Sequence, residues 1–258
     1  MPILEFILLS GPRQSGKTTL TKQLLKTLIT YFDLEEDPQF YRRWQKTHLD
    51  VMLRQDFLDL YSIRALKRLE LLIDLLKPRV SSTTSYSNLA HDLQVDSKTI
   101  KNWLEMLESI YAVFNITPYH TPIARSILKE PKFYFYDVGR VADKGARLEN
   151  LVACSLLKEI HYLEDAYGYK GRLHYLKTKE GQEIDFLITI DEKPILCVEV
   201  KNTDDTPARS FHYFSKFLGD MPRIQLVASM KREFITQDGI QVSYLANFLS
   251  RFSLNDYL

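Results

Sequence analysis

The stretch "EGQEIDFLITIDEKPILCVEVKN", residues 180–202, constrains the fold of this chain most. Apolar side chains recur at every second position before and after the turn "DEKP", a period typical of β-strands and not of helices. The sequence therefore predicts two antiparallel strands joined by a tight turn. The apolar positions are Ile184, Phe186, Ile188 and Ile190 before the turn, and Leu196, Val198 and Val200 after it.

The remaining positions of this hairpin place acids against each other. A turn centred on Glu192 sets Asp185 opposite Glu199, and directly opposed side chains have Cβ atoms about 4.5–5.5 Å apart. Two such carboxylates repel, and a divalent cation is the natural reason to keep them together. Hard oxygen ligands suit Mg²⁺ or Mn²⁺. We therefore predict Asp185 and Glu199 as metal ligands and catalytic residues.

Two further side chains are candidate catalytic residues of the same site. Lys201 lies on the same face as Glu199, where its ammonium can orient an attacking water or neutralise charge in a transition state. Glu149, in a predicted helix over residues 146–163, can reach the same place. The alternative is an exposed hairpin face with a cross-strand pair between Glu183 and Lys201, because open hairpin faces often carry charges.

A phosphate-binding loop lies near the N-terminus, in "SGPRQSGKTTL" at residues 10–20. The pattern G-x-x-x-x-G-K-[ST] follows a predicted strand over 3–9 and precedes a predicted helix over 18–28. Backbone N–H groups and the helix N-terminus would cradle phosphate, while the lysine and the following hydroxyl would reach the terminal phosphates and Mg²⁺ of bound ATP. The predicted nucleotide-binding residues are Gly11, Gly16, Lys17, Thr18 and Thr19.

The sequence beside this loop lacks a clear acidic strand of the kind that ATP hydrolysis requires. A nucleotide-hydrolysing site needs an acidic strand beside the loop to hold Mg²⁺. Residues 29–38, "ITYFDLEEDP", supply one further strand, but no alternation of strands and helices follows Pro38. The strand "KFYFYDVG" at 132–139 offers Asp137 as an alternative Mg²⁺ ligand. This strand lies beyond a helical module, which favours its assignment to another domain. We expect weak ATP binding and no efficient hydrolysis.

The middle of the chain predicts a winged helix. Residues 62–78 form an apolar helical stripe that ends at Pro78, and residues 86–111 form a short helix, a turn and a longer helix capped by Asp96. Two strand-like runs at 112–119 and 132–138 follow, joined by a loop that would form the wing. The predicted buried positions of the helix pair are Leu89, Leu93, Val95, Ile100, Leu104 and Leu107, and the predicted basic residues of the wing are Arg125, Lys129 and Lys132.

The second helix of this pair presents polar side chains where a recognition helix would meet a DNA major groove. The candidate DNA-contacting residues are Lys98, Lys101 and Asn102. The alternative is a solvated helix face or a surface that packs against protein, and the acidic Glu105 and Glu108 further along argue against DNA contact by the whole helix.

Composition places limits on these interpretations. Hydrophobic content of 45%, charged content of 26% and a net charge of +1 over 258 residues are ordinary for a folded protein, so DNA binding would need a local basic patch. The two cysteines, Cys154 and Cys197, lie among apolar residues and predict small buried side chains. No apolar run approaches a membrane span and no signal peptide is evident, so we expect a cytoplasmic protein without membrane contact.

The hairpin residues resemble the PD-(D/E)xK nuclease-like superfamily, whose motif is a carboxylate on one strand and E-x-K on the next. Asp185, Glu199 and Lys201 match that motif, and Glu149 matches the helical glutamate of many members. The whole chain resembles a bacterial and archaeal family in which an AAA-type ATPase core is joined to a C-terminal domain of unknown function. "GPRQSGKTTL", "YFDLEEDP", "LDVMLRQDFLDL", "PKFYFYDVG", "LENLV" and "EIDF…VEVK" occur in that family's order.

One departure from the family is large. Where its members carry well over a hundred residues between "YFDLEEDP" and "LDVMLRQD", this chain has only "QFYRRWQKTH". The resemblance thus implies an internally shortened member that lacks most of the ATPase core. A smaller departure is Lys177, where the family usually has arginine.

The expected architecture is α/β and α+β, in three parts. These are a truncated P-loop strand–helix segment at 1–40, a helical or winged-helix domain at 41–140 and a PD-(D/E)xK-like mixed-sheet domain at 141–258. The expected function is a Mg²⁺- or Mn²⁺-dependent phosphodiesterase acting on DNA. The alternatives are an ATP- or ADP-binding regulatory or interaction module with an inactive nuclease-like scaffold, and a remnant whose exposed strand edge at 3–9 pairs with another protein or a second copy.

Overall fold

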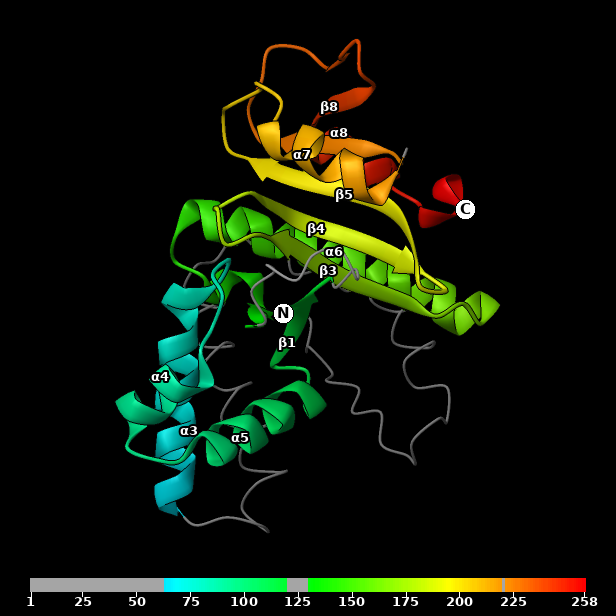
Figure 1. Cartoon of the computed structure of the whole chain (residues 1–258). Coiled ribbons are helices and arrows are strands. Elements are labelled where there is room, and N and C mark those ends of the chain that lie inside the picture. The colour runs from blue at the N-terminus through cyan, green and yellow to red at the C-terminus, as the bar shows by residue number, and fades with distance from the viewer. Residues whose placement is uncertain (1–62, 120–129, 220) are drawn as a thin grey trace, which may run out of the picture. The chain divides into compact units, whose positions relative to one another are not determined.

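The computed structural model describes residues 63–119, 130–219 and 221–258, with the side chains of 63–66 left out (Figure 1). All of them belong to the second of two compact units, Phe57–Leu258. The predicted strand at 3–9 and two residues of the wing, Arg125 and Lys129, lie outside the described residues. So do the predicted nucleotide-binding residues Gly11, Gly16, Lys17, Thr18 and Thr19.

Three helices open the described part, and they lie where the sequence predicts them. They are α3 (Ile63–Leu76), α4 (Tyr86–Leu93) and α5 (Ser97–Ser109). Pro78 lies in a short 3₁₀ turn (Lys77–Arg79) directly after α3, as a proline that cannot continue a helix should. The predicted apolar stripe is confirmed wherever its side chains are described, because Leu69, Leu72, Ile73 and Leu76 are all buried.

The turn between α4 and α5 is fixed by local interactions. Gln94 adopts the left-handed conformation that ends α4, and the Asp96 carboxylate accepts a hydrogen bond from Thr99 N at 2.7 Å as the predicted N-cap of α5. Five of the six predicted core residues of the pair are buried, whereas Val95 in the turn is only half-buried. Trp103, which was not among the predicted core residues, is also buried.

A mixed sheet of eight strands follows, in the order β2-β1-β3-β4-β5-β6-β8-β7. Strands β1 and β2, β3 to β5, and β7 and β8 pair antiparallel, whereas β1–β3, β5–β6 and β6–β8 pair parallel. The mixed α/β fold class is therefore confirmed at this level. The strands are β1 (Val113–Pro118), β2 (Lys132–Phe135), β3 (Gly171–Lys177), β4 (Glu183–Ile190), β5 (Lys193–Lys201), β6 (Arg223–Val227), β7 (Phe234–Ile235) and β8 (Ile240–Tyr244).

Three more helices pack on this sheet. The long helix α6 (Lys144–Tyr167) contacts β2, β3 and β5, while α7 (Arg209–Leu218) contacts β4. The helix α8 (Leu245–Arg251) contacts β6 and β8. Asp143 caps the N-terminus of α6, and Gly168 ends it in the left-handed conformation that favours glycine. Figure 1 shows α6 and α7 beside the central strands β3, β4 and β5.

The predicted hairpin is β4 and β5. Its turn is Asp191 and Glu192, both with positive φ (47° and 67°), which suits a two-residue hairpin turn. Phe186 pairs with Val198 and Ile188 with Leu196, and a bulge between Ile188 and Thr189 shifts the register near the turn. Away from the turn the register extends toward Asp185 and Glu199, as the sequence predicts.

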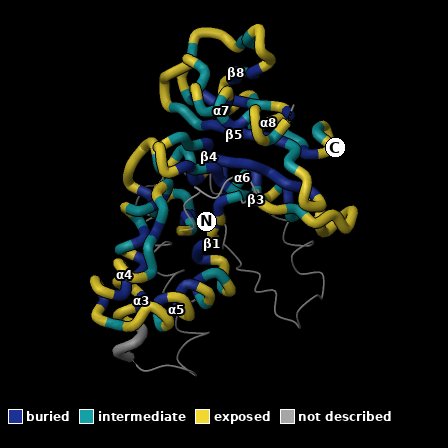
Figure 2. Tube along the Cα trace, in the orientation of Figure 1, coloured by how far each residue is buried: buried dark blue, intermediate teal, exposed yellow. Residues whose placement is uncertain are grey.

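The alternative of an open, solvated hairpin face is wrong. Strands β4 and β5 lie in the middle of the sheet, and of the seven residues of β4 after Glu183 six are buried and one, Asp185, is half-buried. Figure 2 shows this pair of strands as largely buried along its length. The acids Asp185 and Glu199, at the ends of these strands away from the turn, therefore lie beside the core and not on an open surface.

The sequence predicts β1 and β2 as the wing of a winged helix, and in the structure they belong to the eight-stranded sheet. Thr117 pairs with His174 and Pro118 with Tyr175, so these strands continue into the C-terminal sheet. The placement of Lys132 in the wing loop is wrong, because Lys132 is the first residue of β2 and is fully buried. The next three residues of β2, Phe133, Tyr134 and Phe135, are also buried, so the whole strand lies in the core.

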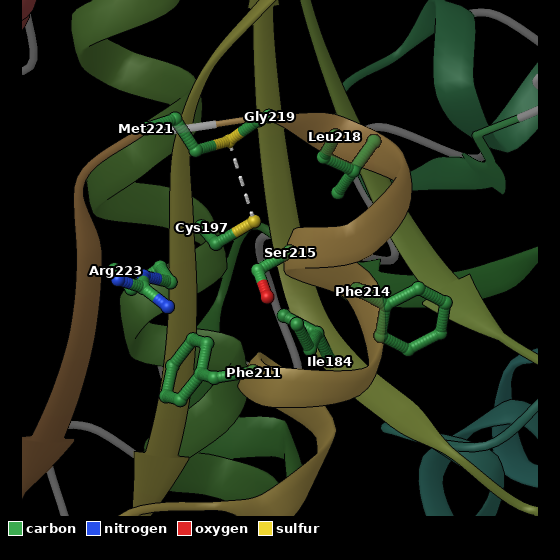
Figure 3. Close-up of a pocket in the computed structure, with 9 residues that line it drawn as sticks. All are labelled: Ile184, Cys197, Phe211, Phe214, Ser215, Leu218, Gly219, Met221 and Arg223. Atoms are coloured by element: carbon green, nitrogen blue, oxygen red, sulfur yellow. Dashed lines mark hydrogen bonds between the residues drawn. The ribbon is translucent and has the colours of Figure 1, made fainter. Parts of the chain in front are cut away.

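Helix α7 closes an apolar core over the strands. Phe211 and Phe214 pack there with Ile184 and Cys197, around a small hollow that Ser215 and Arg223 also line (Figure 3). Both cysteines are free thiols, as predicted, and Cys197 is buried. Cys154 is only half-buried, and burial raises the pKa of both thiols to about 12, which leaves them in the unreactive protonated form.

Candidate functional site

The acid pair, Asp185 and Glu199, lies at the ends of β4 and β5 that are distant from the hairpin turn. The backbone N–H of Asp185 donates to Glu199 Oε2 at 3.3 Å, and that of Val200 donates to Asp185 Oδ2 at 2.9 Å. Each carboxylate is thus held by the neighbouring strand. The structure brings these two predicted ligands together.

Lys201 stands beside the acid pair. Its Nζ lies 2.6 Å from Glu199 Oε1, and its side chain is 35% exposed, whereas that of Glu199 is 7% exposed. Burial alone would lower the pKa of Lys201, but the Glu199 carboxylate outweighs it and the pKa is raised. Lys201 therefore stays protonated at neutral pH and connects the acid pair with solvent.

Burial and like charges act together on the acid pair. Burial raises the pKa of Asp185 well above its ordinary value, and the carboxylates of Glu149 and Glu199 raise it further. The pKa of Glu199 is also raised, chiefly by burial, although Lys201 opposes the shift. These two acids are held close together at an electrostatic cost that their partners within the chain do not remove.

Glu149 extends toward the same acids from α6. The Tyr134 hydroxyl donates to Glu149 Oε1 at 2.6 Å, and Lys132 Nζ lies 3.5 Å from the same oxygen. The next residue of the helix, Asn150, exchanges two hydrogen bonds with the backbone of Phe135 at 2.7 and 2.8 Å. These contacts fix the first turns of α6 on β2, and they position Glu149.

A fourth acid, Glu183, is clamped by two lysines. Lys132 Nζ lies 2.6 Å from Glu183 Oε1, and Lys177 Nζ lies 2.6 Å from Glu183 Oε2. Burial would raise the pKa of Glu183, but the two ammonium groups overcome it and the pKa is lowered. The alternative pair between Glu183 and Lys201 is therefore wrong. We call the whole group the carboxylate cluster, made of Glu149, Glu183, Asp185 and Glu199 with Lys132, Lys177 and Lys201.

The donors suit a hard divalent cation. Asp185 and Glu199 supply neighbouring carboxylates of raised pKa, the donor type that Mg²⁺ and Mn²⁺ prefer together with water and phosphate oxygens. As they stand, no three His, Cys, Asp or Glu side chains among the described residues are arranged to hold a metal ion. A cation would thus be held by the acid pair, while Glu149 is occupied with Tyr134 and Lys132.

Three residues of the site were not predicted to belong to it. Lys132 and Tyr134 lie on β2, far from the hairpin in sequence, and only the sheet brings them to Glu149. Gln225 of β6 pairs in register with Glu199, and its amide binds the backbone of the segment after β5 through Asp204 O, Thr206 O and Ala208 N. A buried glutamine with three backbone partners orders the chain that leaves Lys201.

The predicted DNA-contacting residues lie elsewhere, on α5. Lys98, Lys101 and Asn102 are all exposed, and Lys101 Nζ lies 3.7 Å from Glu105 Oε1. Glu108 does not pair with these basic residues, because it accepts a hydrogen bond from the Asn115 side chain on β1. The side chains of Lys98 and Lys101 are therefore accessible, and the negative charge of Glu105 partly offsets the positive charge of Lys101.

The alternative metal holder Asp137 has a local partner. It follows β2, and its Oδ2 lies 3.1 Å from Arg140 Nε. Strand β2 runs antiparallel to β1, unlike the parallel strands that flank a nucleotide-binding loop. Asp137 therefore belongs to the turn between β2 and α6.

In the part of the chain that the structure describes, no helix is both long and apolar enough to cross a bilayer.

Comparison with known families divides the chain at α6. Residues 31–144 match a family described as Domain of unknown function (DUF8612), and residues 144–248 match one described as Domain of unknown function (DUF4143). No curated protein and no solved structure matches this chain. The first match includes Lys132 and Tyr134, and the second includes both members of the acid pair. The carboxylate cluster is thus assembled from two segments that resemble two different families of unknown function.

Proposed function

We propose that the acid pair binds Mg²⁺ or Mn²⁺ and that this site hydrolyses phosphodiester bonds of DNA. The observation that carries the proposal is the acid pair itself. Asp185 and Glu199 lie on adjacent strands, where Glu199 accepts a hydrogen bond from the backbone of Asp185 and Asp185 accepts one from the backbone of Val200, beside a protonated lysine. The resemblance of Asp185, Glu199 and Lys201 to the PD-(D/E)xK motif in sequence also supports the proposal.

Charge balance supports a cation at this place. The carboxylate cluster holds four acids, Glu149, Glu183, Asp185 and Glu199, against three ammonium groups, Lys132, Lys177 and Lys201. One negative charge remains when every acid is ionised, and burial makes an uncompensated charge costly. Either a proton or a bound cation can remove it. At neutral pH a divalent cation would keep all four acids ionised and would change the net charge of the cluster from −1 to +1.

The chain's own groups have separate tasks in this proposal. When bound, the cation would supply Lewis-acid stabilisation of phosphate oxygens. Asp185 and Glu199 would hold it. Lys201, partly exposed and 2.6 Å from Glu199, would orient the attacking water and neutralise charge that develops on the phosphate. Glu149 would assist from the position in which its hydrogen bond from the Tyr134 hydroxyl holds it.

The test is cleavage of plasmid DNA and of branched DNA in the presence of Mn²⁺. We expect wild-type protein to nick the DNA, and Asp185→Asn, Glu199→Gln and Lys201→Ala each to lower the rate by about a hundredfold or more. Glu180→Gln, which changes an exposed acid in the turn before β4, is the matched control and should cleave normally. Cleavage that survives Lys201→Ala would refute the assigned role.

We further propose that α5 brings DNA to this site through Lys98, Lys101 and Asn102. All three side chains are exposed on one helix of a helix-turn-helix pair, which is the arrangement that a recognition helix needs. Protein packing on the same surface is the competing interpretation. A DNA affinity that does not change with Lys98→Ala and Lys101→Ala would favour that interpretation.

A second candidate function is a nucleotide-binding interaction module on an inactive nuclease-like scaffold, in a shortened member of the AAA-type ATPase family. One observation favours it, because each acid of the carboxylate cluster already has a partner within the chain. Titration with fluorescent ATP tests the module. Binding that disappears in Lys17→Ala, without DNA cleavage by wild-type protein, would support it. A flat titration up to millimolar ATP would remove it.

A further inference from the structure

Lys132 is the most unusual charged residue of the described chain. Its exposed fraction is 0%, although lysine is almost never fully buried unless it is paired. An ammonium group without water needs carboxylates close by, since burying an isolated charge is prohibitively costly. The position of Lys132 at the start of β2 therefore needs an explanation beyond packing.

The contacts of Lys132 converge on the carboxylate cluster. Its Nζ lies 2.6 Å from Glu183 Oε1 on β4 and 3.5 Å from Glu149 Oε1 on α6. It also lies 5.2 Å from the centre of the Tyr175 ring on β3, within the range of a cation–π interaction. One buried ammonium thus joins three elements of the C-terminal part.

Each of the two acids that Lys132 contacts has a second partner. Lys132 and Tyr134 are two residues apart on β2, so they project to the same side of the strand, and both engage Glu149 Oε1. On Glu183, Lys132 and Lys177 take different oxygens, each at 2.6 Å. Two-point contacts of this kind fix the direction of a carboxylate as well as its place.

We propose that Lys132 is a positioning residue, which holds Glu149 and Glu183 in fixed orientations beside the acid pair. Its consequence for cation binding rests on the proposed function, whereas the positioning itself does not. Strand β2, within the segment that matches the first family, is then a working part of the site that the second family's segment carries. Neither segment alone would contain the complete cluster.

A double-mutant cycle on thermal unfolding tests the positioning. Lys132→Gln should lower Tm by about 10 °C, since it removes an ammonium contact from each of two half-buried acids, Glu149 and Glu183. Adding Glu149→Gln should recover part of the loss, because the acid that lost its partner becomes neutral. Lys158→Gln, which changes a lysine whose side chain is 71% exposed although its Nζ lies 3.4 Å from Glu159 Oε1, is the control and should shift Tm by less than about 2 °C. Additive effects of the two buried substitutions would overturn the proposal.

Mn²⁺ affinity, measured by calorimetry on folded variants, tests the consequence. Tyr134→Phe removes only the hydroxyl on Glu149, and Lys132→Gln with Glu183→Gln removes the clamp without changing net charge. We expect both variants to bind Mn²⁺ about tenfold more weakly than wild type. Wild-type affinity in both, with intact folding, would overturn the link to cation binding. A wild-type protein that binds no Mn²⁺ would refute the proposed function, and the unfolding cycle would still decide the positioning.

Discussion

The carboxylate cluster, which contains the four predicted catalytic residues, and the outer face of α5, which carries the predicted DNA-contacting residues, differ in what surrounds their charges. In the cluster, Lys132 and Glu199 are buried, and their ion pairs lie at the end of a central hairpin. On α5, Lys98 and Lys101 are exposed to water. Charges in the first region depend on one another, because water cannot replace a lost partner there. Charges in the second region can change with little effect on folding.

The largest effect should come from the contact that holds α6 beside the cluster. Asn150 is fully buried and bonds both backbone groups of Phe135, so Asn150→Ala removes two buried hydrogen bonds. We expect a loss of about 3 kcal/mol in the free energy of unfolding, measured in urea. Asn102→Ala on the exposed face of α5 is the matched control and should change it by less than about 0.5 kcal/mol. Equal effects would break the contrast between the two regions.

The next effect has the opposite sign. The raised pKa of Asp185, caused by burial and then by Glu149 and Glu199, means that the folded protein keeps this proton at a pH where the unfolded chain has released it. The stability from this proton is present at low pH and is lost as pH rises above the ordinary value of 3.8. Without divalent cation, Asp185→Asn should therefore stabilise the protein by about 1 kcal/mol at pH 8.

The same substitution should have a smaller effect near pH 4, where Asp185 of the wild-type protein already carries its proton. Urea unfolding of both proteins at the two pH values, with a chelator present, measures the difference. Glu180→Gln, on an exposed acid, should show no such pH dependence. An Asp185→Asn protein that is less stable than wild type at pH 8 would contradict the interpretation that this acid is held for function at the expense of stability.

A smaller effect belongs to the helix pair. Asp96 caps α5 through Thr99 N and the Thr99 hydroxyl, at 2.7 and 2.9 Å. Asp96→Ala should lower Tm by about 3 °C, as loss of an N-cap usually does. Asp96→Asn, which retains a cap acceptor, should recover most of this loss. A fall as large as that expected for Asn150→Ala would mean that the helix pair is as interdependent as the cluster.

The smallest effect on folding, and the sharpest test of the outer face, is the pair Lys98→Ala and Lys101→Ala. We expect Tm to stay within about 2 °C, because both side chains are exposed. DNA affinity should fall, and the slope of its logarithm against the logarithm of salt concentration should shrink by about one for each lysine that contacts phosphate. An unchanged salt slope would show that this face does not contact DNA.

Local patterns were enough to predict most of the individual elements. The period of the apolar residues predicted α3, α4 and α5, Pro78 and Asp96 predicted two of their boundaries, and alternation with a short turn predicted β4 and β5. The sequence also predicted the opposition of Asp185 and Glu199, but the turn alone, which pairs Ile190 with Lys193, would set Asp185 opposite Val198. The bulge between Ile188 and Thr189 shifts the register by one residue and brings Glu199 to that place. These features depend on residues that are close in sequence.

The tertiary structure alone decided which charges are buried and which residues complete the cluster. From the sequence, Lys132 read as an exposed basic residue of a loop, because nothing nearby predicts that β1 would pair parallel with β3. That pairing joins the helical half to the C-terminal sheet and brings Lys132 and Tyr134 to Glu149. The sequence determines which side chains can carry a charge. Their burial and their partners depend on segments far apart in the chain, and at this site burial and partners determine the pKa values of the acids.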